Sequence, residues 1–296
     1  MRVVDLTKAN DQNAGIMAFG FFDSIHLGHQ AVIRTAIQLA EENRTISSVF
    51  LFKNNIYPIL GMDKSPIFTF EERVALIESL GVDAVYYVDA DPKYLSLSPT
   101  AFIADLKSHV RLLGFTCGKD FSFGEGGHGR VEDMIDEIGG DYSVCDLIEN
   151  HGEKISSERV KGALKEGDLP LVRRYLGRDF SIVRNVIQGR KDGSKIGFPT
   201  INSDLLNVPL RDGVYFTLVR IGDVVYRAVT NVGAHPTFGD MKKNVESHLL
   251  DYNGDIYNQE VEITFLAFHR GIQCYDSVGA LVDQITKDVE ERRRYD

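Results

Sequence analysis

Two histidines three residues apart, His26 and His29, stand where the sequence changes from an apolar run to a helical pattern. Backbone N–H groups are unpaired at the first turn of a helix, and the helix dipole favours anions there. Imidazoles can donate to phosphate oxygens, and Gly28 lets a phosphate approach the backbone closely. The pair therefore suits phosphoryl or nucleotidyl transfer, which depends on positioning and on stabilisation of charge.

Two other interpretations of the histidine pair stay open, a structural role and a metal site completed by further ligands. We take His26 and His29 as candidate catalytic residues. The candidate nucleotide-binding residues of this turn are Gly20, Phe22 and Gly28.

A glycine-rich stretch, "CGKDFSFGEGGHGR" at residues 117–130, follows a short strand pattern. Its glycines would keep the backbone close to a ligand, and its aromatic rings could cover a flat ring. The alternative is a glycine-rich surface loop without a ligand. The candidate binding residues here are Asp120, Phe121 and Phe123.

Hydroxyl and cationic side chains gather again in "ISSERVK" at residues 155–161. At a helix N-terminus such residues can form a triphosphate site. The serines could equally be helix caps and nothing more. The candidate nucleotide-binding residues are Ser156, Ser157, Arg159 and Lys161.

The segment "IQGRKDGSKIGFPTINSD" at residues 187–204 brings oxygen ligands to an extended chain. Thr200 and Asn202 are two residues apart and so point the same way. A hydroxyl and an amide oxygen are hard ligands that Mg²⁺ accepts beside nucleotide phosphates, and Gly189 and Gly197 would let backbone N–H groups meet those phosphates. The local alternative is a glycine-rich turn with a proline at a sheet edge.

A carboxylate lies further along, in "VESHLLDYN". Strand alternation places Glu246 and His248 on one face. A strand carboxylate can be a solvated edge residue, but beside Mg²⁺–ATP it would serve as the base for a substrate hydroxyl. Glu246 is therefore the third candidate catalytic residue.

From residue 14 to about 150, short apolar runs alternate with helical patterns. Strands are expected at 14–22, 46–52, 83–90, 115–118 and 141–148, and helices at 30–44, 69–81 and 98–114. The last of these helices has Ser98 as its cap and Gly114 as its stop signal. This alternation predicts an α/β fold with βαβ units and a parallel sheet covered by helices on both faces.

The pattern changes in the second half of the chain. Helices are expected at 156–167 and 168–177, then strands at 180–189, 213–222, 223–233, 245–253 and 261–270, and a last helix at 277–294. Short strands with period-two character and turn signals between them predict a small antiparallel β-barrel. The domain boundary is expected near residue 178.

Composition narrows the classes of protein. The net charge of −10 opposes non-specific binding of nucleic acid, so small molecules are the expected partners. The sequence shows neither a membrane-spanning apolar run nor a signal peptide, and a cytoplasmic location is the expectation. Three widely spaced cysteines support neither a disulfide framework nor a zinc site.

The motifs "HLGHQ", "GKDFSFG" and "ISSERVK", in this order and with these separations, resemble the bacterial bifunctional riboflavin kinase/FMN adenylyltransferase (FAD synthetase) family. The second half is similar to the same family through "PTIN" and the strand with Glu246. The resemblance implies a Rossmann-like nucleotidyltransferase domain over residues 1–178. It also implies a β-barrel riboflavin kinase domain, with a C-terminal helix, over residues 179–296.

The resemblance implies a transferase that phosphorylates riboflavin to FMN with ATP and adenylylates FMN to FAD, with Mg²⁺ in both steps. Thr200 and Asn202 would bind the metal and the nucleotide, and Glu246 would activate the ribityl 5′-hydroxyl. The glycine-rich loop would bind the flavin. The alternatives are that one activity survives alone, or that the chain is a flavin-binding regulator, which would need no base.

The first half departs from the family pattern at two places. A Phe-Glu-Pro-His-Pro stretch is replaced around Lys53, Asn54 and Asn55, and Ile-Ser-Ser-Thr-x-x-Arg is altered by Glu158 and Lys161. Lysine meets phosphate as a point charge, whereas arginine binds it through two parallel hydrogen bonds. We expect adenylyl transfer to be slower than phosphorylation of riboflavin.

Overall fold

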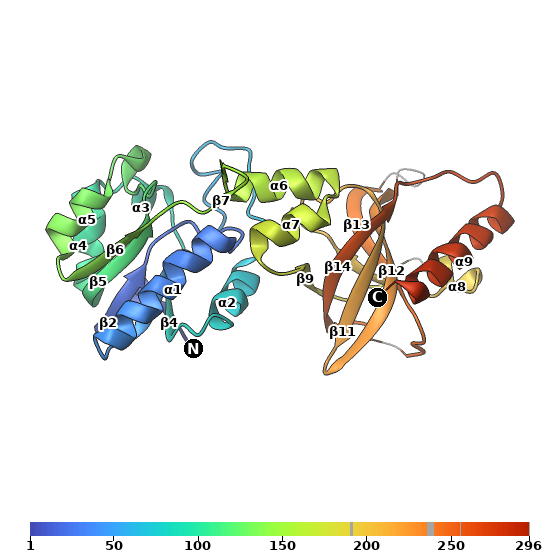
Figure 1. Cartoon of the computed structure of the whole chain (residues 1–296), viewed down its shortest axis with the longest axis horizontal. Coiled ribbons are helices and arrows are strands. Elements are labelled where there is room, and N and C mark those ends of the chain that lie inside the picture. Colours follow the sequence, from blue (N-terminus) through green and yellow to red (C-terminus); the bar gives the residue numbers. More distant parts are fainter. Residues whose placement is uncertain (190–191, 236–239, 255, 296) are drawn as a thin grey trace. The chain divides into compact units, whose positions relative to one another are not determined.

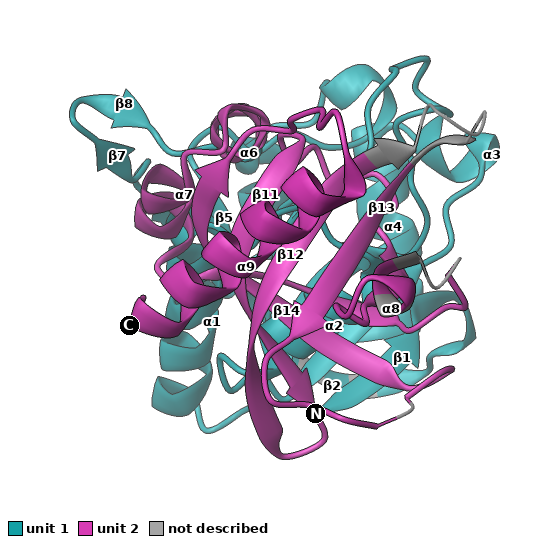
Figure 2. Cartoon of the chain, turned by 90° about the vertical axis from the view of Figure 1, so that its right-hand side faces the viewer, with its two compact units in different colours: residues 1–157 teal, residues 158–296 magenta. Residues whose placement is uncertain are grey.

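A computed structural model describes residues 1–189, 192–235, 240–254 and 256–295. The chain divides into two compact units, Met1–Ser157 and Glu158–Asp296, which Figure 2 colours separately. The predicted boundary near residue 178 lies further along, after two helices that follow this division. It stays a prediction.

The first unit is built on a six-stranded sheet in which every pairing between neighbouring strands is parallel. In spatial order the strands are β1 (Arg2–Asp5), β4 (Ala84–Val88), β3 (Ser47–Phe52), β2 (Asp11–Ala18), β5 (Val110–Gly118) and β6 (Asp141–Cys145). A separate hairpin pairs β7 (Glu149–Asn150) with β8 (Glu153–Lys154).

Helices cover both faces of this sheet (Figure 1), as the sequence predicts. On one face Val32, Ile33 and Ile77 pack on the strands, and on the other face Phe102 and Met134 do so. The helices are α1 (Leu27–Glu42) and α2 (Phe70–Glu78) on the first face and α4 (Pro99–His109) and α5 (Val131–Ile138) on the second, with α3 (Pro92–Leu95) and the 3₁₀ turns Leu6–Lys8 and Glu125–Gly127 between elements.

The expected helix over residues 98–114 is wrong beyond His109. Val110 already has extended backbone angles and begins β5. Gly114 lies inside this strand, where a Cβ atom would overlap the backbone of Asp141 on β6. The glycine thus permits close strand packing and does not end a helix.

The second unit is a six-stranded antiparallel sheet that curls on itself, which confirms the predicted barrel-like architecture. Its edges meet because Arg184 donates from Nε to the Asp204 carbonyl at 3.0 Å and Ile187 donates from its backbone to Asn202 at 2.8 Å. In spatial order the strands are β10 (Ile201–Asp204), β13 (Asp240–Leu249), β12 (Val224–His235), β11 (Gly213–Ile221), β14 (Glu260–Arg270) and β9 (Phe180–Asn185). The helices are α6 (Ser157–Glu166), α7 (Leu169–Leu176), α8 (Asp192–Lys195) and α9 (Val278–Arg294).

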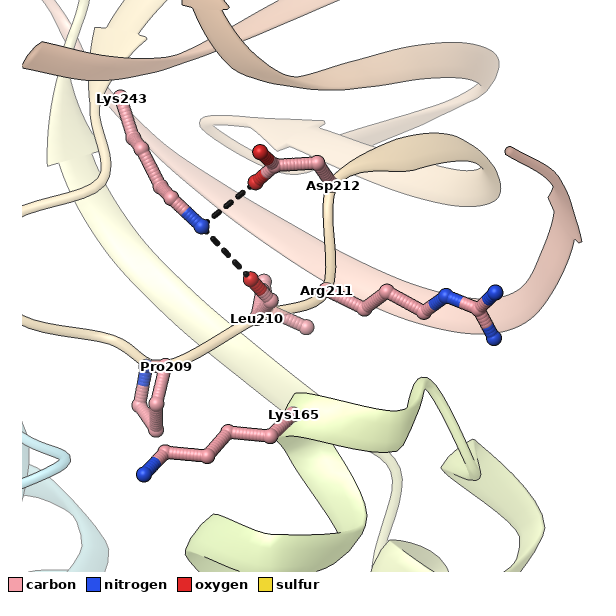
Figure 3. Close-up of a pocket in the computed structure, with 6 residues that line it drawn as sticks. All are labelled: Lys165, Pro209, Leu210, Arg211, Asp212 and Lys243. Atoms are coloured by element: carbon pink, nitrogen blue, oxygen red, sulfur yellow. Dashed lines mark hydrogen bonds and ion pairs between the residues drawn. The ribbon is translucent and has the colours of Figure 1, made fainter. Parts of the chain in front are cut away.

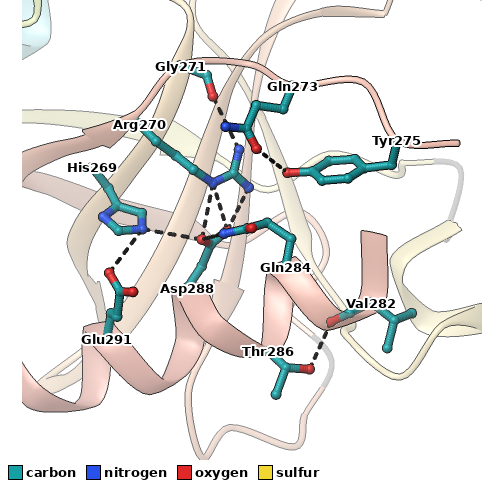
Figure 4. A network of polar contacts seen from close by, with 10 residues as sticks. All are labelled: His269, Arg270, Gly271, Gln273, Tyr275, Val282, Gln284, Thr286, Asp288 and Glu291. Carbon is teal, nitrogen blue, oxygen red and sulfur yellow. Dashed lines mark hydrogen bonds and ion pairs between the residues drawn. The ribbon is translucent and has the colours of Figure 1, made fainter. Parts of the chain in front are cut away.

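A buried carboxylate fastens α9 to the curled sheet. Asp288 is 1% exposed and accepts hydrogen bonds from Arg270 Nη2 (2.6 Å), His269 Nε2 (3.2 Å) and Gln284 Nε2 (2.8 Å). Figure 4 shows these side chains converging on Asp288. Burial opposes ionisation of Asp288, but the hydrogen bonds from Arg270 and Gln284 outweigh it and hold the pKa of the carboxyl below its usual value.

We expect Asp288→Asn to lower the free energy of unfolding by about 3 kcal/mol at pH 7, measured by urea unfolding. Loss of one partner of a buried pair costs about 3–5 kcal/mol, and Arg270 keeps some access to solvent, which favours the lower end. Because the pKa of Asp288 is lower in the folded state, the stabilisation is complete above the unfolded pKa. It disappears as pH falls through the folded pKa.

Asp283→Asn is the matched control, since Asp283 lies exposed on the same helix. Equal stability of the two variants at pH 7 would contradict the role assigned to Asp288.

Two candidate nucleotide sites

The turn that carries His26 and His29 lies at the topological switch point of the first unit. β2 leads through α1 to β3 on one side, whereas its other neighbour, β5, leads through α5 to β6 on the opposite side, so the connections from these two adjacent strands diverge. The ends of β2 and β5 are adjacent, and Phe19 N–H donates to the Thr116 carbonyl at 2.8 Å. Ligands of open α/β sheets bind at this kind of crevice.

Buried hydrogen bonds fix the backbone of this turn. Phe22 and Ile25 are buried and both have φ of 46°, a left-handed conformation that non-glycine residues adopt at a cost of about 1–2 kcal/mol. Asp23 Oδ1 accepts from Ile67 N–H at 2.6 Å, and Gln30 Nε2 donates to the Ile25 carbonyl at 2.9 Å. The surrounding structure thus holds a strained turn at a predicted site.

The two imidazole rings stack on each other, with centroids 3.7 Å apart. His26 caps α1, because its Nδ1 accepts from His29 N–H at 3.2 Å. That acceptor role places the proton of neutral His26 on Nε2. Among the described residues, His29 Nδ1 is buried without a hydrogen-bond partner.

Both histidines are neutral at pH 7. Burial lowers the pKa of His26 to about 4, and the charge of Lys154 acts in the same direction. The pKa of His29 is well below its usual value, through burial first and then the charges of His26 and Lys154. The rings can therefore offer neutral N–H donors at the N-terminus of α1.

The glycines of this turn have a packing role of their own. A Cβ at Gly28 would lie 3.0 Å from the His26 ring, and a Cβ at Gly20 would lie 3.0 Å from the Phe22 ring. Their absence of a side chain lets the rings pack over the backbone.

The glycine-rich loop begins where β5 ends, beside the histidine turn. Asp120 forms an ion pair with Lys154 of β8, and Phe121 stacks on Phe123 with centroids 5.7 Å apart. Phe123 belongs to the hydrophobic core, whereas Phe121 is only partly buried against it. Their role in flavin binding stays a prediction, and Phe121 has the ring that a flavin could reach more easily.

The "ISSERVK" segment meets the histidine turn through one hydroxyl. Ser157 Oγ lies 3.0 Å from Ser24 Oγ, while Ser156 is partly buried. Lys161, nearly buried, has its ammonium 3.9 Å from the Glu158 carboxylate. Arg159 and Lys161 belong to the second unit, and their part in a triphosphate site stays a prediction.

The altered stretch after β3, Lys53 to Asn55, makes contacts that hold the backbone in place. Asn54 exchanges two hydrogen bonds with the backbone of Ala90, at 2.7 and 2.9 Å. Asn55 Oδ1 accepts from Tyr57 N–H at 3.1 Å. Lys53 lies over the Tyr87 ring, 5.6 Å from its centroid. The contacts of Lys53 and Asn54 could not be seen in the sequence, because they join segments that are distant along the chain.

The kinase candidates of the second unit share one face of the curled sheet. Asn202 of β10 lies directly opposite Glu246 of β13, and Asn231 of β12 lies opposite Glu246 on its other side. Side chains directly opposite each other in such a sheet have Cβ atoms roughly 5 Å apart. Asn231 could not be found from the sequence, because the register between distant strands cannot be seen there.

The segment that carries Thr200 lies along this face. A Cβ at Gly189 would overlap the Asn202 amide, and a Cβ at Gly193 would lie 3.5 Å from Thr200 Oγ1. His248 Nδ1 lies 2.8 Å from the Pro199 carbonyl and fixes the segment to β13. Gly197 has φ of +90°, which favours glycine. Residues 190–191 of the motif lie outside the described residues.

A pocket of about 270 Å³ opens beside Thr200. It is lined by residues 199–201, 252–254 and 256–257, with Val186 and Leu249. Tyr252 and Tyr257 give it aromatic walls. A small concave site with aromatic walls and a hydroxyl suits a nucleotide base next to metal-bound phosphates.

A larger hollow of the second unit, about 540 Å³, does not form a convergent site. Figure 3 shows Lys165 and Arg211 pointing in different directions. Lys243 is paired with Asp212 at 2.6 Å, and Arg211 stacks over Phe268 at 4.6 Å. Two of its cations, Lys243 and Arg211, therefore already have partners of their own.

Neither site resembles a metal cage. Within the described ranges, no group of three or more His, Cys, Asp or Glu side chains could hold a metal ion. Asn202 and Glu246, which lie opposite each other, instead offer oxygen donors on one face, and Thr200 comes just before β10. Such a donor set fits Mg²⁺ held largely by phosphates and water. No helix among the described residues is long and apolar enough to cross a membrane.

Two family models match the chain. The model described as FAD synthetase matches residues 8–159, and the model described as riboflavin kinase matches residues 176–295.

Curated relatives match over nearly the full length. The chain is 35% identical to the bifunctional riboflavin kinase/FMN adenylyltransferase of Bacillus subtilis, over 96% of this chain and 93% of that protein. It is 30% identical to the protein of the same name from Escherichia coli strain K12, with the same coverage.

A solved structure has the same fold. The crystal structure titled as a macrolide-efflux protein from Streptococcus pneumoniae superposes with a TM-score of 0.87 and 28% identity, covering 100% of both chains. The two family models and the curated relatives all point to flavin nucleotide synthesis.

Proposed function

The chain belongs to the family of bifunctional riboflavin kinases/FMN adenylyltransferases, and we propose that each of its two reactions has its own site, adenylyl transfer at the histidine turn and riboflavin phosphorylation at the face with Glu246. The chain is a transferase of FAD biosynthesis, which phosphorylates riboflavin to FMN and adenylylates FMN to FAD with ATP. A single surviving activity or a flavin-binding regulator is not favoured, since both family models match.

For the kinase reaction we assign the base to Glu246. Its carboxylate would take the proton of the ribityl 5′-hydroxyl while that oxygen attacks the γ-phosphorus of ATP and ADP leaves. The observation that carries this assignment is the register in which Asn202 and Asn231 flank Glu246. The pocket beside Thr200 would hold the adenine.

The hydroxyl of Thr200 and the amide oxygen of Asn202 would hold Mg²⁺ beside the phosphates. A bound Mg²⁺ would neutralise charge that develops on the phosphate oxygens. Gly189 supports this arrangement, because its missing side chain lets the Asn202 amide lie against the backbone.

We expect Thr200→Ala to raise the Mg²⁺ concentration needed for half-maximal FMN formation by roughly tenfold, since it removes an oxygen ligand and leaves Asn202 in place. The measurement is a Mg²⁺ titration at fixed ATP and riboflavin. Thr286→Ala is the control, because this hydroxyl lies exposed on α9 and donates to the Val282 carbonyl. An unchanged Mg²⁺ requirement in Thr200→Ala would contradict the ligand role.

For adenylyl transfer we assign the histidine turn and the loop after β5. A phosphate oxygen of FMN would attack the α-phosphorus of ATP, and pyrophosphate would leave. Neutral N–H donors of His26 and His29 would stabilise the phosphate oxygens at the N-terminus of α1. Ser156, Ser157, Arg159 and Lys161 are assigned to the triphosphate, and Asp120, Phe121 and Phe123 to the flavin.

We also propose that the adenylyltransferase domain covers residues 1–178 and the kinase domain residues 179–296. Supporting this boundary, the riboflavin kinase model begins at residue 176 and the FAD synthetase model ends at residue 159. The net charge of −10 supports small-molecule substrates and no nucleic acid as partner. A cytoplasmic location, where ATP and riboflavin are both available, fits these reactions.

The experiment is incubation of the full chain with riboflavin, ATP and Mg²⁺, followed by chromatographic separation of the flavins. We expect FMN first and FAD later, with the second step slower. FMN without FAD would support a kinase alone. Neither product from folded protein would contradict the proposal.

A further inference from the structure

A cation outside the sequence motifs, Lys154, lies beside the predicted adenylyl transfer site. It ends β8 and stands three residues before Ser157, whose hydroxyl meets Ser24 of the histidine turn at 3.0 Å. The ammonium of Lys154 is paired with the Asp120 carboxylate. Asp120 in turn folds back over the carboxyl end of β5, since a Cβ at Gly118 would lie 3.1 Å from its Oδ1.

Lys154 is also close enough to the histidine turn to affect the pKa values of its two imidazoles. Its charge contributes to the lowered pKa of both His26 and His29. Asp120 acts on His26 in the opposite direction. The Lys154–Asp120 pair thus lies within electrostatic reach of the two stacked rings at the switch point.

Adenylyl transfer needs more positive charge than this turn provides. The attacking phosphate of FMN and the triphosphate of ATP are both anionic, and the pyrophosphate that leaves gains charge. The histidines are neutral at pH 7, and a helix N-terminus contributes only about half of an elementary charge. A full positive charge at this edge of the sheet would therefore bind phosphate oxygens and stabilise the leaving group.

Resting on the proposed function, we propose that Lys154 is a phosphate-binding residue of the adenylyl transfer site. Asp120 holds its ammonium over the carboxyl edge of the sheet until a phosphate oxygen takes the place of the carboxylate. Lys154 transfers no proton and forms no covalent bond. The phosphate it meets belongs either to the triphosphate of ATP or to FMN, and the experiment separates these two.

Another lysine of the same unit, Lys119, is a matched control for a purely structural role of Lys154. Lys119 also pairs with an aspartate, Asp146, and also ties the loop after β5 to the segment that follows β6. Both lysines are largely solvent-accessible, with side chains 59% exposed for Lys119 and 41% for Lys154. If the pairs only hold the loop, the loss of either lysine should have the same small effect.

The experiment measures conversion of FMN to FAD by the full chain with Lys154→Ala, Lys154→Arg and Lys119→Ala, at excess Mg²⁺. For Lys154→Ala we expect KM for ATP and Ki for pyrophosphate to rise roughly 10- to 100-fold, the range for a charged hydrogen bond. Ki for adenosine, which has no phosphate, should stay unchanged, as should the rate of riboflavin phosphorylation. Lys154→Arg should restore most of the affinity, and Lys119→Ala should resemble the wild type.

A rise in KM for FMN with unchanged Ki for pyrophosphate would also support a phosphate role and would assign Lys154 to the phosphate of FMN. Unchanged constants in Lys154→Ala would overturn the inference. So would an equal rise in Ki for adenosine, or an equal effect of Lys119→Ala, because a structural role predicts both. A wild-type chain that makes no FAD would contradict the proposed function itself, which is a distinguishable result.

Discussion

Glu246→Gln is expected to lower the rate of FMN formation by roughly 10²- to 10⁴-fold, the contribution of a positioned general base. Glutamine keeps the shape of the side chain and can still lie between Asn202 and Asn231, but it accepts no proton from the ribityl hydroxyl. The loss should appear in kcat, with the KM for riboflavin nearly unchanged. The measurement is initial-rate formation of FMN from riboflavin and ATP.

Glu262→Gln is the matched control on the same sheet. Glu262 lies on β14, half-exposed, and its carboxylate is 3.2 Å from Arg220 Nε. The change removes a partly exposed carboxylate from β14, which lies three strands away from β13 in the sheet. Near-normal FMN formation by Glu246→Gln, with riboflavin bound, would remove Glu246 from the mechanism.

The kinase face shows what strand alternation can predict. Alternation predicts that Thr200 and Asn202, two residues apart, point the same way, and it places Glu246 and His248 on one face of β13. The sequence cannot show that the two segments pair so that Asn202 opposes Glu246, since that register depends on packing between distant strands. Asn231 enters the site through the same non-local register and was missed.

The parallel sheet shows where local signals mislead. Residues 110–113 continue the apolar pattern of α4, and Gly114 follows them, which is typical of a helix end. The same residues must instead fill a strand between β2 and β6, and tertiary packing outweighs the local preference. The helical pattern of α5 follows the glycine-rich loop, and the short β1 lies at the sheet edge. Neither was predicted.

At the histidine turn, too, the sequence predicts the local structure but not the contacts made by folding. The sequence places His26 and His29 at a strand-to-helix turn, which the structure confirms at the end of β2. Their neutral state could not be predicted, because it follows from burial of the stacked rings. The partnership of Lys154 with Asp120 was also hidden, since 33 residues separate them in the sequence.

His29→Ala is expected to lower FAD formation from supplied FMN by roughly 10²- to 10³-fold, the loss found when one preorganised donor to a developing oxyanion is removed. The ring of His29 packs between His26 and Phe22, with centroids 3.7 and 5.3 Å away, so its orientation is fixed before substrate arrives. Phosphorylation of riboflavin should be unchanged, because the kinase residues lie in the other unit. The two rates are measured separately, starting from FMN or from riboflavin.

His109→Ala is the control in the same unit. His109 ends α4 and precedes Val110, the first residue of β5. Its Nδ1 lies 3.3 Å from the Ala9 carbonyl. It therefore lies at the amino ends of the strands, whereas the histidine turn lies at their carboxyl ends. Its loss should leave both reactions intact. If His29→Ala is folded by circular dichroism and yet loses both activities, two separate sites cannot be right. Metal analysis of the same variant decides the remaining alternative: a transition metal that is bound in the wild type and lost with His29 would make the histidine pair a metal site, whereas its absence from both leaves the pair as donors to phosphate.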